Sequence, residues 1–360
     1  MVRHTEIERR FVLLNPNLGY IKRNSIGSRI CQGYFPTPAH NTVRIRQVDW
    51  FNYSVASKKG IGRSRLETEF TLTDFFQGKT LLDAYQYHLK KRRYRVGIFE
   101  VDIYKGSLAG LIILEREMHA VDEEFELPEW AGPESAIEIT EKISGYDLAK
   151  LASLLSGIKD HPPVAELVTE QLPITVITGG PGSGKTGILD ILQKEMADIY
   201  HFIPEAATII IRQVGVAFPN GNPFYVRQFQ QQVYAIQQSF ELLAGIHGKL
   251  KHRSALITDR GSMDNSAYLP GGIREYQRVC HTKASFELAR YARVIHLGMP
   301  PRDVYEEHKQ KNPARTEIYE QACELHAKIA TAWLGHPNYV LVDEQAWDSK
   351  IQVVRNILTQ

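Results

Sequence analysis

The stretch Gly179-Gly180-Pro181-Gly182-Ser183-Gly184-Lys185-Thr186 fits the phosphate-loop pattern G-x-x-x-x-G-K-[ST] at every fixed position. An apolar, β-branched run precedes it at residues 174–178, and residues 187–197 follow with the apolar spacing of a helix. In such a unit the glycines let backbone N–H groups close around phosphate oxygens, and the helix N-terminus adds positive potential. Lys185 would reach the β and γ phosphates, and Thr186 would ligate Mg²⁺. We therefore expect a site for ATP or GTP, because a glycine-rich turn that matches by chance would not explain the flanking strand and helix.

The composition describes a globular chain. It has 360 residues with 43% hydrophobic content, enough for two or three domains, and its formal net charge is only +2. Cys31, Cys280 and Cys323 are far apart and lack metal-ligand spacing, which argues against a disulfide framework and a zinc site. The first residues lack an apolar signal core, and no apolar stretch approaches the ~20 residues of a membrane span. We expect a cytoplasmic protein.

Charged residues alternate with apolar ones in many short segments of the first 156 residues. In Glu6-Ile7-Glu8-Arg9-Arg10, a period of two places Glu6, Glu8 and Arg10 on one face of a strand. The same spacing recurs at Arg44 and Arg46, Glu67 and Glu69, Lys91 and Arg93, Glu100 and Asp102, and Glu115 and Glu117. We expect eight strands, near residues 5–14, 25–35, 41–48, 50–58, 64–71, 91–96, 98–104 and 110–117, and one helix over about 74–90.

The segregation of the charges favours a closed sheet. For a single strand of this kind, the simplest interpretation is a solvated outer face over an apolar core. Here, however, acidic pairs and basic pairs lie on separate strands. If the sheet closes into a barrel, the charges point inward and the apolar side chains pack outside against helices. We therefore expect an α+β domain built on a closed eight-stranded antiparallel β tunnel with a charged interior.

These segments resemble, in order, the CYTH domain of the triphosphate tunnel metalloenzymes, whose N-terminal signature is an E-x-E-x-K strand. Glu6-Ile7-Glu8-Arg9-Arg10 is similar to that strand, with Arg10 in place of the lysine. The resemblance covers about residues 3–156. It includes a Q-G-Y turn at Gln32-Gly33-Tyr34, an R-x-R strand at Arg44-Ile45-Arg46, an E-x-E strand at Glu67-Thr68-Glu69, a K-x-R-Y strand at Lys91-Arg92-Arg93-Tyr94, and the pairs Glu100-Val101-Asp102 and Glu115-Arg116-Glu117.

The resemblance implies a tunnel in which basic side chains grip a triphosphate while carboxylates hold a divalent cation that activates water. It gives catalytic roles to Glu6, Glu8 and Arg10. The triphosphate would be bound by Arg44, Arg46, Lys58, Lys91 and Arg93, and the metal by Glu6, Glu8, Glu67, Glu69, Glu100, Asp102, Glu115 and Glu117. Clustered carboxylates tolerate one another only around a cation, and hard oxygen ligands favour Mg²⁺ or Mn²⁺ over zinc.

Two positions differ from the family pattern or leave a choice. Arg10 is a permanently charged planar group, so it suits phosphate binding without a role in proton transfer. Lys58 and Lys59 are adjacent, so only one of them can point into the tunnel. We favour Lys58.

The second half of the chain predicts a different domain. Residues 157–172 contain Asp160-His161-Pro162-Pro163 and predict a linker. Beyond it, apolar runs at 201–203, 255–259, 293–297 and 339–342 alternate with helical sequence, including a long helix near 223–246. This alternation predicts an α/β P-loop NTPase domain with a mainly parallel sheet over residues 173–360, following a tunnel domain over residues 1–156.

Three further residues are candidates in this second site. Asp259 ends an apolar strand, from which it would reach Mg²⁺ through water; a helix cap is the alternative role. Asp259-Arg260-Gly261 with Asp264 and Tyr268, Pro204-Glu205-Ala206-Ala207, and residues 312–317 together resemble an AAA-type, kinase-like ATPase family often found beside CYTH domains. That resemblance implies that Glu205 faces a phosphoryl acceptor. It also implies that Arg315 neutralises charge on the transferred phosphoryl group, for which a solvated helix charge is the alternative.

Three hypotheses for function remain open. The first is a metal-dependent triphosphatase tunnel, acting on inorganic or organic triphosphate and joined to a P-loop unit that binds ATP or GTP. The second is a small-molecule or nucleotide kinase in which the tunnel is a substrate or regulatory site. The third is a nucleotide-gated interaction module. A nucleic-acid partner is not favoured, because strand alternation divides the basic residues near 90–95 between two faces.

Overall fold

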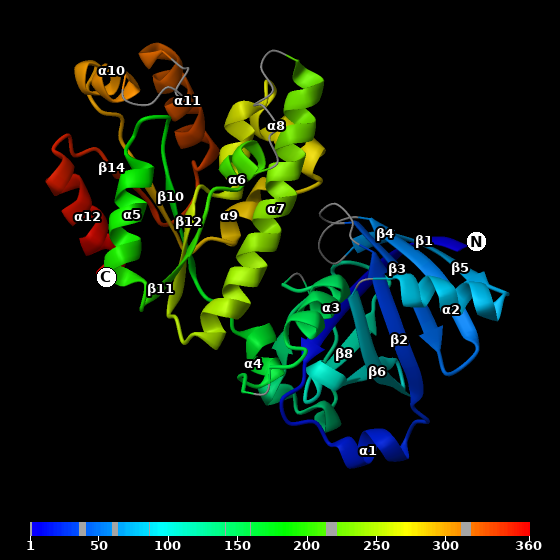
Figure 1. Cartoon of the computed structure of the whole chain (residues 1–360). Coiled ribbons are helices and arrows are strands. Elements are labelled where there is room, and N and C mark those ends of the chain that lie inside the picture. The colour runs from blue at the N-terminus through cyan, green and yellow to red at the C-terminus, as the bar shows by residue number, and fades with distance from the viewer. Residues whose placement is uncertain are drawn as a thin grey trace. The chain divides into compact units, whose positions relative to one another are not determined.

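The computed structural model describes residues 2–35, 41–59, 64–85, 87–140, 142–158, 160–213, 222–310 and 318–360. The chain divides into two compact units, Met1–Gln171 and Leu172–Gln360 (Figure 1). Helix α4 (Val164–Thr169) lies within the stretch for which a linker was expected, and it belongs to the first unit. Among the described residues, no helix has both the length and the apolar character that crossing a membrane requires.

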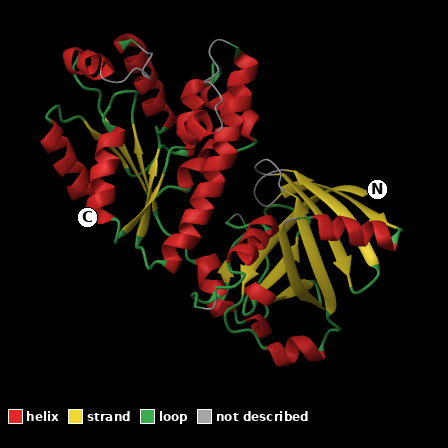
Figure 2. Ribbon diagram, in the orientation of Figure 1, coloured by secondary structure: helices red, strands yellow, loops and turns green. Residues whose placement is uncertain are grey.

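The first unit is built on an antiparallel sheet that closes on itself (Figure 2). Around the barrel, the described strands follow in the order β5 (Ser64–Leu72), β4 (Asn52–Lys59), β3 (Asn41–Val48), β2 (Ser28–Phe35), β6 (Tyr87–Val96), β7 (Phe99–Lys105), β8 (Ile112–Glu117) and β1 (Val2–Val12). Strand β1 closes the barrel because its first half pairs with β5 and its second half with β8. A short strand, β9 (Ile137–Glu138), extends the sheet beside β1. The predicted eight-stranded tunnel is confirmed.

Apolar side chains lie on the outside of this barrel, where helices cover them. Ile45 lies between two inward-pointing arginines and is fully buried against Tyr53, Leu82 and Tyr85. Leu82 and Tyr85 come from helix α2 (Phe75–Ala84) and the residue that follows it. The alternation of charged and apolar residues therefore places a polar surface inside the barrel and an apolar core outside it.

Two elements of the first unit differ from the prediction. Helix α2 ends at Ala84 rather than near residue 90, because the alternating segment that begins at Tyr87 belongs to strand β6. Helix α1 (Leu18–Arg23) was not predicted; it is short and begins where the Asn17 side chain accepts a hydrogen bond from the Tyr20 backbone at 2.9 Å. The remaining helices of the unit are η1 (Gly106–Leu108), η2 (Glu129–Ala131), η3 (Pro133–Ser135) and α3 (Gly145–Leu154).

The second unit is a parallel sheet between helices. Its described strands lie in the order β11 (Tyr200–Ile203), β12 (Ala255–Asp259), β10 (Ile174–Thr178), β13 (Arg293–Leu297) and β14 (Tyr339–Val342). Helices α5 (Lys185–Met196) and α12 (Trp347–Thr359) pack together on one face, and α7 (Pro223–Leu250) packs on the other (Figure 1). The other helices are α6 (Ala206–Gln213), η4 (Ser262–Tyr268), α8 (Gly272–Cys280), α9 (Ala284–Ala289), α10 (Arg302–Gln310) and α11 (Tyr319–Ala332). The predicted α/β domain with a parallel sheet is confirmed.

Candidate functional site

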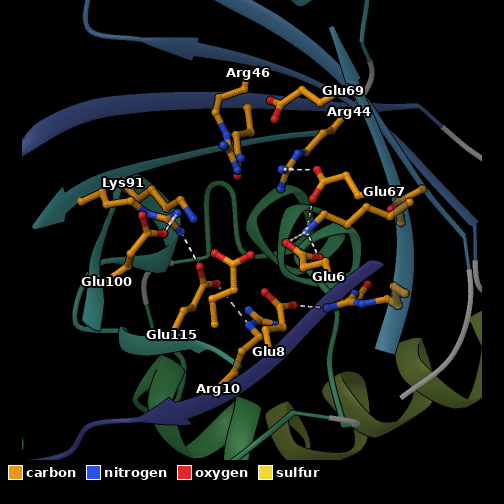
Figure 3. Close-up of a pocket in the computed structure, with 18 of the residues that line it drawn as sticks. Glu6, Glu8, Arg10, Arg44, Arg46, Glu67, Glu69, Lys91, Glu100 and Glu115 are labelled. Atoms are coloured by element: carbon orange, nitrogen blue, oxygen red, sulfur yellow. Dashed lines mark hydrogen bonds and ion pairs between the residues drawn. The ribbon is translucent and has the colours of Figure 1, made fainter. Parts of the chain in front are cut away.

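The interior of the barrel contains a cavity of about 380 Å³ (Figure 3). Among the described residues that line it, eight are basic and seven are acidic, a difference of one positive charge. The basic residues are Arg10, Arg44, Arg46, Lys58, Arg65, Lys91, Arg93 and Arg95, and the acidic residues are Glu6, Glu8, Glu67, Glu69, Glu100, Glu115 and Glu117. The sequence had not marked several of the lining residues as site candidates, among them Gln32, Tyr34, Arg65 and Tyr104, although all four lay within the strand segments that it singled out.

Basic and acidic side chains concentrate on different parts of the cavity wall. Strands β3 and β6, which flank β2, carry two pairs of basic residues, whereas the carboxylates come from β7, β8, β1 and β5, which are consecutive around the barrel. Figure 3 shows Arg44 and Arg46 pointing into the cavity from one side and Glu8 and Glu115 from the opposite side. A basic part of the wall thus faces an acidic one.

Lys58 connects two glutamates in the acidic part of the wall. Its Nζ lies 2.6 Å from Glu6 Oε1 and 3.4 Å from Glu67 Oε2, and Arg44 Nη2 lies 2.9 Å from Glu67 Oε1. Burial alone would raise the pKa of Glu67, but Arg44 and Lys58 outweigh it and hold that pKa below its ordinary value. Lys58 therefore occupies the cavity, whereas Lys59 is exposed.

Arg10 is held in the wall of the cavity by two hydrogen-bond partners. Its Nε donates to Glu115 Oε1 at 3.2 Å and its Nη1 to the carbonyl of Ile143 at 2.7 Å. Burial would lower the pKa of Arg10, yet Glu115, Tyr104 and Glu8 together outweigh this effect and the pKa is raised. Glu8, the other predicted catalytic carboxylate on this strand, pairs with Arg65.

Arg93 and Lys91 share a carboxylate behind the lining. Arg93 donates to the two oxygens of Asp102 at 2.7 and 2.5 Å, and it also pairs with Glu115. Lys91 pairs with the same Asp102, and burial together with Arg93 lowers the pKa of Lys91 to about 8. Asp102, an expected metal ligand, is fully buried and does not line the cavity, and both of its oxygens accept from basic side chains.

Arg46 differs from its neighbours because no carboxylate pairs with it in the part of the chain that the structure describes. When the Gln32 amide is oriented to face it, the Gln32 oxygen accepts from Arg46 Nε at 2.9 Å and from Nη2 at 3.2 Å. Burial, together with Arg44 and Arg93, lowers the pKa of Arg46 to about 10. Glu69 partly opposes this shift but does not pair with Arg46, so the cavity contains a cation without an ion-pair partner among the described residues.

The carboxylates of the cavity fit a divalent cation by their chemistry. Glu6 and Glu8 on β1 and Glu67 and Glu69 on β5 present hard oxygen donors from paired strands, as Mg²⁺ and Mn²⁺ require. Across the described ranges, no three or more His, Cys, Asp or Glu side chains form an assembled metal site. Several of these carboxylates are instead paired with basic side chains, so binding a metal requires such pairs to exchange.

The phosphate loop lies between β10 and α5 in the second unit. Gly179, Gly182 and Gly184 have positive φ angles, at 143°, 84° and 93°, which other residues rarely adopt. Lys185 is buried, and its Nζ donates to the carbonyls of Gly179 at 2.8 Å and Gly180 at 2.9 Å. Burial and the nearby Arg260 lower its pKa to about 8. Thr186 is exposed at the start of the helix.

A charged cluster lies beside this loop at the end of β12. Arg260 Nε donates to Glu205 Oε1 at 2.6 Å, while its Nη1 lies 3.2 Å from Asp264 Oδ2 and 3.3 Å from the Gly179 carbonyl. Asp259 Oδ1 is buried without a hydrogen-bond partner among the described residues, and burial and Glu205 raise the pKa of Asp259 to about 6. The sequence gave Arg260 and Asp264 no role, although both lay in the motif that it singled out.

Two further predictions for this unit concern Asp259 as a helix cap and Arg315 as a contact of the transferred phosphoryl group. Helix η4 begins after Gly261 without a side-chain cap, so Asp259 does not cap it. Arg315 and the segment 312–317 lie outside the described residues.

A histidine pair that the sequence did not indicate also adjoins the loop: the Gly180 N–H donates to His326 Nδ1 at 3.3 Å, and His296 Nε2 lies 3.1 Å from the same atom.

Comparison with known proteins identifies the second unit. Residues 174–350 match the family model described as an AAA domain. The second unit is thus similar to AAA domains and contains a P-loop. The matched residues do not include the tunnel unit, for which the sequence resemblance to the CYTH domain remains a prediction.

Several solved structures are similar to parts of the chain. A hypothetical protein of known crystal structure is 29% identical, with 40% of this chain and 97% of that chain covered and a TM-score of 0.30. NadR in complex with NAD and AMP-PNP is 12% identical, with 54% and 51% covered and a TM-score of 0.37. Shikimate kinase from Acinetobacter baumannii in complex with shikimate is 14% identical, with 52% and 94% covered and a TM-score of 0.32. No curated protein sequence matches the chain.

Proposed function

We propose that the tunnel binds and hydrolyses a linear triphosphate, either inorganic or part of an organic molecule, with Mg²⁺ or Mn²⁺, and that the P-loop unit binds ATP or GTP. The observation that carries the proposal is Arg46, a cation in the cavity without a carboxylate partner among the described residues. Arg44 and Arg93 lie close enough to Arg46 to lower its pKa, so this part of the wall repels itself when empty. A bound polyanion relieves that repulsion.

The balance of charge supports a divalent cation as the second component. Eight basic and seven acidic residues among those described line the cavity, so they alone cannot neutralise the several negative charges of a triphosphate. Glu6 and Glu8 would hold the metal, together with Glu67 and Glu69 from the neighbouring strand. When bound, the metal would neutralise phosphoryl charge and favour ionisation of a coordinated water.

The basic residues have distinct tasks in this proposal. Arg44 and Arg46 from β3 and Lys91 and Arg93 from β6 approach the ligand from one side and orient its phosphates. Arg10 lies across the cavity, fixed by Glu115 and the Ile143 carbonyl. Because the guanidinium of Arg10 stays protonated, it stabilises phosphoryl charge and does not deliver a proton.

The test is phosphate release from inorganic triphosphate, thiamine triphosphate and nucleoside triphosphates in the presence of Mg²⁺. The variant Glu8→Gln keeps the shape of the side chain and removes its charge, so we expect it to lose most of the activity. Glu126→Gln changes an exposed glutamate outside the cavity and is the matched control. The proposal fails if the wild type releases phosphate from none of these compounds, or if Glu8→Gln keeps full activity in a folded protein.

A second candidate function is a kinase in the P-loop unit, with the tunnel as a substrate or regulatory site. The observation that favours it is the cluster of Glu205, Asp259 and Arg260 beside Lys185, because carboxylates at that position suit the binding of a phosphoryl acceptor. This alternative predicts that ATP is converted to ADP only with an acceptor present and that Lys185→Ala abolishes the conversion.

A further inference from the structure

An indole lies directly against the phosphate loop. Trp347 begins helix α12 and comes from a part of the sequence far from the loop. A Cβ added to Gly184 would lie 2.7 Å from Trp347 Cζ3, and one added to Gly187 would lie 2.9 Å from Cη2. Both distances are too short for a real Cβ, so the two glycines allow the six-membered ring of the indole to reach the backbone.

Gly187 is the more informative of the two glycines. Gly184 is a fixed position of the phosphate-loop pattern, but Gly187 follows that pattern and lies in the first turn of α5. Glycine destabilises a helix interior by roughly 0.5–1 kcal/mol relative to alanine. The close approach of the indole is the structural reason for a glycine at this position.

The indole is held in place by the packing of α12 against α5. Ile351, Val354 and Leu358 of α12 share an apolar core with Ile188 and Leu192 of α5. Arg355 also pairs with Glu195 of α5, with Nη2 2.6 Å from Oε1 and Nε 2.9 Å from Oε2. Figure 1 shows the two helices side by side. The position of Trp347 relative to the loop is therefore fixed before any ligand binds.

Part of the indole remains uncovered. Trp347 is 44% exposed, although its ring edge contacts the loop. A phosphate loop binds the phosphates of a nucleotide through the backbone amides that lead into the helix, with the lysine reaching the β and γ phosphates. The nucleoside end of the ligand then lies towards the first turn of the helix, which is where Gly187 and the indole meet.

We infer that Trp347 is a stacking platform for the base of the bound nucleotide, an inference that rests on the proposed binding of ATP or GTP at the loop. Aromatic side chains stack on nucleobases of every kind, because each base has a π face. The platform therefore strengthens the binding of adenine and guanine nucleotides alike and contributes nothing to a ligand without a base. That contrast separates stacking from a merely structural role of the indole.

The experiment uses the full-length protein carrying Glu8→Gln, so that the tunnel does not consume the triphosphates, and measures its affinity for MgATP and MgGTP by calorimetry and the displacement of MgATP from the loop by inorganic triphosphate. In Trp347→Leu, which keeps an apolar side chain, we expect ATP and GTP to bind about 5- to 150-fold more weakly. The affinity of the loop for inorganic triphosphate, obtained from the displacement of MgATP, should not change. Trp347→Phe should recover part of the lost affinity, and Trp50→Phe, which removes an exposed tryptophan from the first unit, should have no effect.

Two results would overturn the inference alone: unchanged nucleotide affinity in Trp347→Leu, or an equal weakening of nucleotides and inorganic triphosphate. A wild type that binds neither ATP nor GTP, or binds them equally well after Lys185→Ala, would instead overturn the proposed nucleotide site and the inference with it. The quenching of tryptophan fluorescence by MgATP gives a second readout. We expect the quenching to disappear in Trp347→Leu and to persist in Trp50→Phe.

Discussion

Replacing Arg46 with methionine is expected to have opposite effects on stability and on triphosphate binding. The structure places Arg46 in a cavity where burial, Arg44 and Arg93 lower its pKa from 12.5 to about 10. At about 1.4 kcal/mol for each pH unit, this difference disfavours the charged guanidinium by roughly 3 kcal/mol in the empty tunnel. Methionine is unbranched and replaces the aliphatic part of the arginine side chain, so it removes the charge and keeps the packing of that part.

The stability gain is smaller than that figure because the substitution also removes the hydrogen bonds to Gln32, at 2.9 and 3.2 Å. Hydrogen bonds from a charged group contribute about 1.5–3 kcal/mol. We therefore expect Arg46→Met to be more stable by up to about 1.5 kcal/mol in denaturant unfolding of the ligand-free protein. The same variant loses a charged contact with the ligand, so its triphosphate affinity should fall roughly 10- to 150-fold.

Lys59→Met is the matched control, because Lys59 adjoins the tunnel residue Lys58 but is exposed. It changes the net charge equally and should alter neither quantity appreciably. Denaturant unfolding and calorimetry with inorganic triphosphate together decide the outcome. An Arg46→Met variant that is clearly less stable than the wild type and binds triphosphate equally well would refute the argument that Arg46 is an unmatched cation kept for an anionic ligand.

Three further predictions concern metal and pH. Removing divalent cations with a chelator should abolish triphosphate hydrolysis, and Mg²⁺ or Mn²⁺ should restore it; activity that persists in the chelator would contradict the proposed role of the carboxylates. The pKa of Lys91 is about 8 because of burial and Arg93, so Lys91 loses its charge as the pH rises through 8, and triphosphate affinity should fall. Lys91→Arg should flatten this dependence of affinity on pH, and the same dependence in the variant and the wild type would contradict the prediction. Burial lowers the pKa of His296 from 6.5 to about 3, so between these values the unfolded chain binds a proton that the folded chain does not. Stability therefore falls as the pH is lowered through this range, by up to about 1.4 kcal/mol per pH unit. Acid unfolding of His296→Asn should show a shallower slope, and an unchanged slope would show that another group governs it.

Much of the barrel could be predicted because its pattern is local. Alternation with a period of two fixes which side chains share a face, and the segregation of acidic and basic strands indicated that this face points inward. The same alternation allowed only one of the adjacent Lys58 and Lys59 to point into the tunnel, and Lys58 was favoured. The ends of α2 and the short helix α1 were harder, since α1 is defined by one cap at Asn17 rather than by a long apolar period.

Contacts between distant segments could not be predicted. The sequence placed Glu6 and Lys58 on inward faces, but only the closure of the barrel through β5 brings them into contact. The absence of a carboxylate partner for Arg46 within the described residues depends equally on how the strands are ordered around the cavity. The meeting of Trp347 with Gly187 had no signal in the sequence beyond an unexplained glycine in the first turn of a helix.

In the function proposed above, the tunnel hydrolyses triphosphate independently of the phosphate loop. The most direct test is triphosphate hydrolysis in the wild type, Lys185→Ala, Glu8→Gln and the double variant, at constant Mg²⁺ and with folding verified. Because Lys185 and Glu8 lie in different units, we predict that Lys185→Ala abolishes nucleotide binding but keeps wild-type hydrolysis, while Glu8→Gln does the reverse. Loss of triphosphate hydrolysis in a folded Lys185→Ala protein would contradict the claim and confine the chemistry to the P-loop unit.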